Sequence, residues 1–392
     1  MKFTVNLSEF AKVLNKILPA IPRKSTLPVL EHFQFILNGN NLDLIATDQD
    51  IILKATSQVN GTEDGSVLVP AKKLSDIVKA LDNVGELEFS VDQSNLEISL
   101  KSEAGTYDMK GLDSDEYLRL PELFDTEKPD INHIKENDDV KIAILKAQDI
   151  QKLAGNALFA VSADEFRPAM TGVFLQFKGD LAYAVSTDSF RLVRVVAKAG
   201  EHKFPEDFNV IIPANSAEIL KKVEGDVILS SISNFKNLTN LRFDFDNIVF
   251  ITKIINEKFP PYESVVPKNN NLILTASRND LLKKIKRVSI FTSSISHQIK
   301  LSLYSDHLIV SGEDEDAGNK GMETLACDFT GEEMTIGFNV KYLEEAITHL
   351  DQIEGDDNFY MFISDPTKPV LLSAIDKLND SIMLVMPTRL IA

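Results

Sequence analysis

The chain has 392 residues, with 59 acidic and 41 basic side chains, a net charge of −18, and 44% hydrophobic residues. This length indicates two or three domains, and the apolar content excludes a largely disordered protein. A single cysteine, Cys327, excludes an internal disulfide framework, and no apolar run approaches the ~20 residues of a membrane span. The N-terminal MKFTVNLSEF lacks the apolar core of a secretory signal. We therefore expect a soluble, cytoplasmic protein that does not bind membranes.

Three segments open in the same way, with a short β-type run that passes through a polar residue into apolar residues at helical spacing. They lie at residues 3–18, 140–161 and 272–291. The third segment has the clearest helical stripe, made of Leu281, Leu282, Ile285 and Val288. We predict a strand followed by a helix at each of the three places.

A second strand-to-helix step follows in each segment, beginning at Val67, Val210 and Thr335. Pro70 and Pro213 lie 143 residues apart, at the change from strand to helix. Phe338 takes the equivalent place 125 residues further on. This second step strengthens the case for an internal repeat.

Two further features recur. Each segment is expected to close on an apolar strand that ends in proline, at Pro121, Pro267 and Pro387. In addition, LIATDQDIIL around Asp48 and AVSTDSFRLV around Asp188 are offset by 140 residues. Several correspondences in the same order are unlike the loose similarity that arises between unrelated proteins of mixed structure.

Together these features predict three copies of a unit of about 125 residues. Alternating runs such as LEFSVDQSNLEISL and LRFDFDNIVFITKI supply strands between the helices. The predicted fold class is α+β, with three repeated domains, each of two helices packed on a mostly antiparallel sheet. Their predicted boundaries are 1–125, 139–267 and 271–392, joined by polar linkers at 126–139 and 267–271.

Nine short motifs follow one another along the whole chain. They are MKFTV at the start, RKSTLPVL (23–30), LIATD (44–48), VPAKKL (69–74), RPAMTGV (167–173), STDSFRL (186–192), KFPPYESVVPK (258–268), IGFNVKYL (336–343) and VMPTRL (385–390). In this order they resemble the bacterial DNA polymerase III β subunit family, the processivity sliding clamps. The resemblance implies three DNA-clamp domains per chain and a homodimer that closes head to tail into a ring around double-stranded DNA.

The resemblance also implies the function and the partners. A clamp tethers the replicative polymerase to DNA and so gives processivity, without catalysis and without a cofactor of its own. The implied partners are the replicative DNA polymerase alpha-type subunit, an ATP-driven clamp loader complex, and other polymerases and repair proteins that bind through short linear motifs. The chain itself has no nucleotide-binding motif, so the energy for ring opening must come from elsewhere.

Positive charge is concentrated in the predicted helices, although the whole chain is acidic. Residues 8–24 carry a balance of +3 and residues 277–292 a balance of +4, whereas residues 340–352 carry −2. The six helix windows together carry +7, which leaves −25 on the rest of the chain. Such a pattern favours phosphate contacts on an inner surface that are independent of sequence. The candidate DNA-binding residues are Lys12, Lys16, Arg23, Lys24, Lys72, Lys73, Lys79, Lys152, Arg167, Lys221, Lys222, Lys283, Lys284, Lys286 and Arg287.

The resemblance further implies an apolar pocket for partner peptides between the second and third domains. Its wall corresponds to Met170, Thr187, Arg191, Leu192, Pro260, Val265, Val340, Val385, Met386, Pro387, Arg389 and Leu390. Methionine and aliphatic side chains suit a short, partly aromatic motif. Two features depart from the family pattern. Phe190 stands where histidine is frequent and changes the pocket rim, and Ile391 and Ala392 extend past the usual terminal leucine, where they could lie across the pocket mouth.

Enzyme motifs are missing from the sequence. The six histidines show no paired metal spacing, and neither glycine-rich phosphate loops nor a GxSxG nucleophile turn is found. We interpret Cys327 as a buried structural thiol and EDED at 313–316 as a solvated acidic loop. We therefore expect no catalytic and no metal-binding residues. Two alternatives to the clamp stay open: a scaffold ring that does not encircle DNA, and an unrecognised hydrolase of repeat origin.

Overall fold

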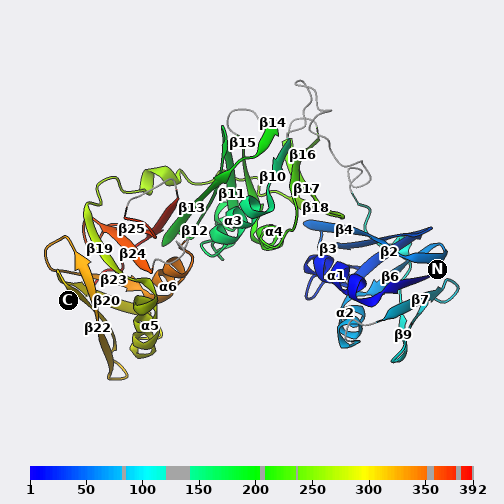
Figure 1. Ribbon diagram of the computed structural model, residues 1–392, viewed down its shortest axis with the longest axis horizontal. Helices are drawn as coiled ribbons and strands as arrows, with labels where there is room; N and C mark the ends of the chain where they lie inside the picture. The colour runs from blue at the N-terminus through cyan, green and yellow to red at the C-terminus, as the bar shows by residue number, and fades with distance from the viewer. Residues whose placement is uncertain are drawn as a thin grey trace. The chain divides into compact units, whose positions relative to one another are not determined.

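The computed structural model describes residues 1–81, 85–120, 142–203, 208–234, 237–350, 357–376 and 381–390. The chain divides into two compact units. The first unit comprises Met1–Ala147, Ala199–Pro205 and Lys222–Ile254, and the second comprises Gln148–Lys198, Glu206–Lys221 and Ile255–Ala392. The division passes through the middle one of the three sequence repeats, so this repeat contributes strands to both units (Figure 1).

The first repeat lies entirely in the first unit. Its strands are β1 (Lys2–Asn6), β2 (His32–Asn38), β3 (Asn41–Thr47), β4 (Ile51–Gln58), β5 (Asn60–Glu63), β6 (Gly65–Pro70), β7 (Glu86–Asp92), β8 (Glu97–Ser102) and β9 (Gly105–Lys110). Helix α1 (Leu7–Ile17) follows β1, and helix α2 (Ala71–Ala80) follows β6. The two helices pack side by side (Figure 1).

The middle repeat has the same order of elements. It consists of β10 (Ile142–Leu145), α3 (Ala147–Leu158), the 3₁₀ turn η5 (Pro168–Met170), β11 (Gly172–Lys178), β12 (Leu181–Thr187), β13 (Arg191–Lys198), β14 (Glu201–Lys203), β15 (Phe208–Pro213), α4 (Ala214–Leu220), β16 (Val227–Asn234), β17 (Asn237–Phe245) and β18 (Ile248–Lys253). Each helix again follows a short strand directly, as the sequence predicts.

The third repeat follows the 3₁₀ turn η6 (Tyr262–Val265). It consists of β19 (Leu272–Ser277), α5 (Arg278–Val288), the 3₁₀ turn η7 (Ser289–Phe291), β20 (Gln298–Leu303), β21 (His307–Asp314), β22 (Asn319–Phe329), β23 (Met334–Asn339), α6 (Val340–Thr348), β24 (Asn358–Ile363), β25 (Val370–Ser373) and β26 (Ile382–Val385). The long strand β22 takes the places of two shorter strands of the other repeats, β4 and β5 in the first.

The strand order within the sheets repeats as well. The first unit contains the sheets β5-β1-β7-β8-β9 and β14-β10-β16-β17-β18-β4-β3-β2-β6, and the second contains β15-β11-β12-β13-β26-β25-β24-β19-β22-β21-β20-β23. Each repeat thus supplies the same two antiparallel sets, for example β4-β3-β2-β6 and β5-β1-β7-β8-β9 in the first. The predicted α+β fold with three repeated domains is confirmed.

Neighbouring repeats are joined by antiparallel strand pairs, and the same two strands of the repeat pair at both junctions. Strand β4 of the first repeat pairs with β18 of the second, with Leu53 opposite Phe250. Strand β13 of the second repeat pairs with β26 of the third, with Leu192 opposite Leu384. Because backbone hydrogen bonds continue across each junction, the sheet passes from one repeat into the next without a break.

Polar caps explain why the helices begin where they do. The side chains of Asn6 and Ser277 accept hydrogen bonds from backbone N–H groups at the starts of α1 and α5. The Asn339 side chain does the same for α6. Asn339 also aligns with Pro70 and Pro213, the residues that precede α2 and α4. The expected equivalence of Phe338 with these prolines is therefore wrong by one residue, because Phe338 is a fully buried strand residue.

The expectation that each repeat closes on an apolar strand ending in proline is wrong for two of the three repeats. Only β26, before Pro387, is such a strand. The segment before Pro267 contains η6 instead, since Pro261 has a fixed φ of −71° and its carbonyl accepts the Ser264 N–H. Residues 117–120 have no strand partner among the described residues, and Tyr117 packs into the core instead.

Several sequence predictions lie outside the described residues. They are the linker at 126–139, the domain limits at 125 and 139, Pro121, His133, and the C-terminal Ile391 and Ala392. In the second linker, at 267–271, Asn270 is buried and its amide donates to the carbonyls of Phe362 and Pro369. Among the described residues, no helix is long and apolar enough to cross a membrane.

Candidate functional site

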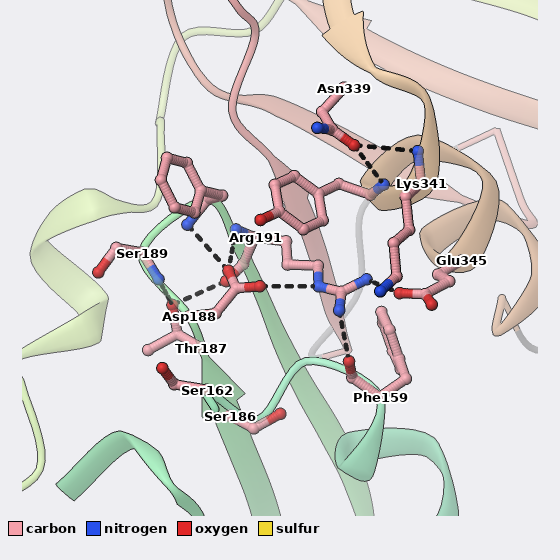
Figure 2. Close-up of polar contacts among 12 residues, drawn as sticks. Phe159, Ser162, Ser186, Thr187, Asp188, Ser189, Arg191, Asn339, Lys341 and Glu345 are labelled. Carbon is pink, nitrogen blue, oxygen red and sulfur yellow. Dashed lines mark hydrogen bonds and ion pairs between the residues drawn. The ribbon is translucent and has the colours of Figure 1, made fainter. Parts of the chain in front are cut away.

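A tight turn between β12 and β13 carries the predicted pocket residues Thr187 and Arg191 (Figure 2). The Thr187 hydroxyl donates to the Arg191 carbonyl at 2.7 Å, and Asp188 Oδ1 accepts from the N–H groups of Phe190 and Arg191 at 2.9 and 3.0 Å. Ser189 has a φ of 78°, a left-handed conformation that these bonds stabilise. The turn around Asp48 has the same bonds, from Thr47 and Asp48, so the sequence offset of 140 residues reflects one repeated structure.

The two turns differ in the side chain that follows. Arg191 is only 6% exposed. Its guanidinium forms ion pairs with Asp188, at 3.2 Å, and with Glu345 of α6, and it donates to the Phe159 carbonyl at 2.7 Å (Figure 2). It also lies between the rings of Phe159 and Tyr342, 5.1 and 4.9 Å from their centroids. Arg191 therefore joins the second repeat to the third and does not stand free for a ligand.

Aromatic stacking continues outward from this arginine. The ring of Phe190 stacks on Tyr342 with centroids 5.5 Å apart, and Phe190 is 52% exposed. Burial raises the pKa of the Tyr342 hydroxyl, so Tyr342 stays neutral at ordinary pH. The residue that departs from the family pattern thus forms an apolar aromatic surface beside the turn.

The C-terminal segment runs past this turn. The Met386 N–H donates to the Phe190 carbonyl at 2.8 Å, and the Thr388 N–H donates to the Gly337 carbonyl at 2.8 Å. Gln298 adds a hydrogen bond from its amide to the Thr388 hydroxyl. These contacts place Met386 and the residues after it between the β12–β13 turn and strand β23.

The twelve predicted pocket residues all lie in the second unit, but they differ in exposure. The buried ones are Thr187, Arg191, Leu192, Val340 and Val385, and the half-buried ones are Met170, Pro260, Met386, Pro387 and Leu390. Val265 and Arg389 are exposed. Leu192 belongs to an apolar cluster with Phe259 and Tyr262, against which Met386 packs. The structure thus has an apolar floor with half-buried side chains above it.

A cavity with a volume of about 190 Å³ lies elsewhere in this unit. It is lined in part by Val193, Met383 and His349. None of the twelve predicted pocket residues lines the cavity.

The predicted DNA-binding cations of the first unit are mostly exposed. Lys12 pairs with Glu9 at 2.8 Å, and Lys16 pairs with Glu224 and Asp246 at 3.4 and 3.2 Å. The remaining ones are exposed side chains in the loop after α1, on α2 and after α4, namely Arg23, Lys24, Lys72, Lys73, Lys79 and Lys222.

In the second unit the predicted cations have different surroundings. Lys152 is half-buried, and Lys221 pairs with Glu218 at 2.6 Å. Arg167 is not helical: it pairs with Asp164 at 2.7 Å and donates to the Ser189 hydroxyl at 2.7 Å. It therefore lies at the rim of the β12–β13 turn rather than on a helix.

The five basic residues of α5 also differ from one another. Arg278 is buried and donates to the carbonyls of Ile347 and Thr348. Lys283 and Lys286 are 67% and 62% exposed, whereas Lys284 and Arg287 both pair with Glu323 of β22. The Arg287 guanidinium lowers the pKa of Glu323 to about 2.

Two other sequence interpretations can be compared with the structure. Cys327 is half-buried, and burial raises the pKa of its thiol to about 11, which fits a structural residue rather than a nucleophile. The acidic run at 313–316 is not wholly a loop, because Glu313 and Asp314 end strand β21 and Glu313 pairs with Lys300 at 2.5 Å. No cluster of metal-ligating side chains occurs in the described part of the chain.

Sequence reasoning did not find the residues that surround Arg191. Tyr342 and Glu345 lie in residues 340–352, which is the one predicted helix window with a negative net charge. This difference from the other five windows was the sequence feature that could have pointed to them. No sequence pattern pointed to Phe159, because it lies 32 residues from Arg191 along the chain.

Three repeats joined edge to edge by paired strands, with basic side chains on their helices, define a sliding clamp. Family models for the DNA polymerase III beta subunit match the N-terminal domain at residues 1–121, the central domain at 144–261 and the C-terminal domain at 263–389. The chain belongs to the DNA polymerase III beta subunit family.

Similar proteins match this chain over its full length. The beta sliding clamps of Chlamydia pneumoniae and Staphylococcus epidermidis are 27% and 28% identical, and the matches cover 100% and 99% of this chain and 99% of each relative. The solved clamp of Bartonella birtlesii, bound to griselimycin, is 26% identical with a TM-score of 0.83 and full coverage of both chains. That of Pseudomonas aeruginosa is 23% identical with a TM-score of 0.84 and the same coverage. The protein is a DNA sliding clamp, a non-catalytic processivity factor of the polymerase.

Proposed function

We propose that two copies of this chain close head to tail into a ring around duplex DNA. The observation that carries this proposal is that the same pairing occurs at both junctions within the chain: β4 pairs with β18, and their counterparts β13 and β26 pair in the same way. The equivalent strands left over are β22 of the third repeat and β9 of the first. If β22 of one copy pairs with β9 of the next, every junction in the assembly has the same geometry and the ring closes.

Both leftover strands are open for such pairing. Strand β9 lies at the edge of its sheet, and residues 319–326 of β22 pair only with β21 among the described residues. Exposed apolar side chains lie close to the edge of β22: Ile290 is 76% exposed and Met322 is 63% exposed. An open strand edge with exposed apolar residues is the usual site of strand addition by a partner.

The basic side chains on the helices supply the DNA contacts of this proposal. Lysine and arginine bind phosphates without reading bases, so binding is independent of sequence and weakens with salt. The acidic remainder of the chain repels DNA, which favours the basic surface over any other. Retention on DNA then depends on ring topology rather than on affinity.

The pocket beside the β12–β13 turn is the proposed site for partners. Its apolar floor, the adaptable Met386 and the exposed ring of Phe190 suit a short linear motif with aliphatic and aromatic residues. The proposed partners are the polymerase, the clamp loader and repair proteins that carry such motifs. The relative from Bartonella birtlesii bound to griselimycin supports a ligand site on clamps of this fold.

Retention on DNA of defined topology tests the ring. The protein is loaded onto a nicked circle by an active clamp loader, washed in high salt, and the circle is then cut. We expect salt-resistant retention that is lost on cutting, because phosphate contacts alone weaken steeply with salt. Loss from circles and linear DNA alike in the salt wash would favour the scaffold alternative.

Alanine at Met386 and Leu390 tests the pocket. The double variant removes two half-buried side chains above the floor, so we expect at least about tenfold weaker binding of a polymerase-derived peptide, measured by fluorescence anisotropy. The oligomeric state of the native protein should be unchanged. Ile36→Ala, an exposed aliphatic residue of β2, is the control and should bind as the wild type does. Unchanged peptide affinity in the double variant would contradict the assignment of the pocket.

A further inference from the structure

Glu323 of strand β22 forms a compact ion cluster with helix α5. Its Oε1 accepts from Arg287 Nε at 2.6 Å, its Oε2 accepts from an Arg287 terminal nitrogen at 2.5 Å, and Lys284 Nζ lies 3.5 Å from Oε2. Glu323 is 26% exposed and Lys284 is 20% exposed. The two-bond geometry of a guanidinium on a carboxylate fixes direction as well as distance.

The cluster lies on the face of β22 that packs against the helix. Leu325, two residues along, is buried, and Gly321, two residues back, is covered by Phe291. A Cβ added at Gly321 would lie 2.8 Å from the Phe291 ring. Residues at this spacing share one face of a strand. Glu323 is therefore the polar member of a row that attaches β22 to α5 and η7, while Met322, on the opposite face, is exposed.

The same cluster divides the basic residues of α5 into two pairs. Lys284 and Arg287 are three residues apart and share one side of the helix, against β22. Lys283 and Lys286 are also three residues apart and lie more exposed. They approach only Asp280, at 4.0 Å, and Glu344, at 3.6 Å, respectively, among the described residues. Two of the five basic side chains of α5 are thus paired with the same carboxylate, which leaves one net positive charge on the cluster.

We propose that Glu323 is a positioning residue for ring closure, which withdraws Lys284 and Arg287 from DNA contact and uses them to fix the open edge of β22 for pairing with a second copy. This inference rests on the proposed head-to-tail homodimer. Lys283 and Lys286 are then the α5 residues that contact phosphates. The predicted DNA-binding residues Lys284 and Arg287 act on the subunit interface instead.

The proposal predicts effects of opposite sign from one substitution. Glu323→Gln keeps the shape of the side chain and removes its charge. The ion pairs that hold strand β22 against helix α5 are then lost, so the dimer weakens. At the same time two cations are released near the DNA-facing pair, so binding to duplex DNA strengthens and depends more on salt. A residue that only stabilised the fold would not strengthen DNA binding.

Two measurements on the full-length protein test this. The dimer dissociation constant, from analytical ultracentrifugation over a concentration series, should rise about three- to tenfold in Glu323→Gln. Binding to a short fluorescent duplex should show a slope of log K against log salt that is steeper by about 1–2, as expected for one or two extra phosphate contacts. Circular dichroism and thermal melting show whether the variant is folded.

Two further variants make the outcome decisive. Arg287→Gln should weaken the dimer to a similar extent without steepening the salt slope, because it removes a cation rather than releasing one. Glu313→Gln, which breaks an ion pair to Lys300 within the sheet, should leave both readouts at the wild-type values.

An unchanged dimer constant or an unchanged salt slope in folded Glu323→Gln overturns the proposal. If that variant does not fold, Arg287→Gln decides through the dimer constant. A wild-type protein that stays monomeric at all concentrations would overturn the homodimer itself, and this is seen before any variant is made.

Discussion

At the residue scale, the most informative comparison is between two aspartates in equivalent turns. Asp48 and Asp188 each accept two backbone N–H bonds in the same geometry. Only Asp188 has a second role, because its other oxygen pairs with the buried Arg191. The sequence predicted the equivalence of the two turns but not this difference, since Ile51 takes the place of the arginine in the first turn.

Alanine at each aspartate should separate the two roles. Asp48→Ala removes hydrogen bonds only, and we expect a loss of about 1–2 kcal/mol in the free energy of unfolding. Asp188→Ala also removes one of the two carboxylates that pair with a buried guanidinium, so the loss should be about 3 kcal/mol. Urea denaturation of the full-length protein measures both. Equal losses of stability in the two variants would mean that the Glu345 carboxylate alone is enough to balance the charge of the buried Arg191 guanidinium.

The carboxylate of Glu323 predicts a pH dependence. Arg287 lowers the pKa of this group in the folded protein to about 2, from an ordinary value of 4.5. A group with a lowered pKa in the folded state stabilises the protein above the unfolded pKa, and this stabilisation is lost as the pH falls toward the folded pKa. The stability difference between wild type and Glu323→Gln should therefore be constant above pH 4.5 and shrink from pH 4.5 toward 2.

Denaturation at a series of pH values measures that difference. A difference that does not change over this range would mean that the charge of Glu323 does not contribute to stability. Glu313→Gln provides a comparison, because Lys300 lowers the pKa of Glu313 too, without a helix partner.

At the scale of elements, the C-terminal segment is attached to strand β23 through one glycine. A Cβ at Gly337 would lie 2.7 Å from a methyl carbon of Leu390 and 2.8 Å from the Thr388 hydroxyl oxygen. The Thr388 N–H donates to the carbonyl of the same glycine. The position of Leu390 at the proposed pocket therefore depends on the missing side chain at Gly337.

Gly337→Ala should displace this segment without unfolding the protein. We expect peptide affinity to fall by about three- to tenfold, because the half-buried Leu390 and Met386 lose their positions while the floor stays intact. Peptide anisotropy measures the affinity, and thermal melting checks the fold. Gly155→Ala in α3 is the matched control, since a Cβ there meets only Lys221 at 3.6 Å. Wild-type affinity in Gly337→Ala would show that the segment does not form the pocket.

At the scale of the whole molecule, the proposed ring closure depends on two open strands, β9 and β22, and on an apolar patch made of the exposed side chains of Ile290 and Met322. A charge in that patch should oppose association, because a buried and unpaired carboxylate is costly. We expect Ile290→Asp to convert the dimer into a monomer at micromolar concentration, as measured by native mass spectrometry. The monomer should bind partner peptide normally, since the proposed pocket lies within one chain. An unchanged dimer dissociation constant would mean that this patch is not part of the dimer interface.

Most of the fold and part of the site were predictable from the sequence. The repeats, the strand-to-helix steps and the turns at Asp48 and Asp188 depend on local rules such as capping, periodicity and turn chemistry, which neighbouring residues express directly. Failures occurred where prolines broke the expected strand before Pro267, and where Phe338 rather than Asn339 was aligned with Pro70 and Pro213. The family followed from the order of short motifs along the chain.

By itself, the sequence determined that this protein is a three-repeat clamp with basic helices. Only the tertiary structure decided which of those basic side chains form ion pairs and which of the predicted pocket residues are buried. Glu323 lies 36 residues from Arg287 along the chain, and Glu345 lies 154 residues from Arg191. These charges have no partner until the chain has folded, so their pairing depends on contacts between distant residues, which local patterns do not contain.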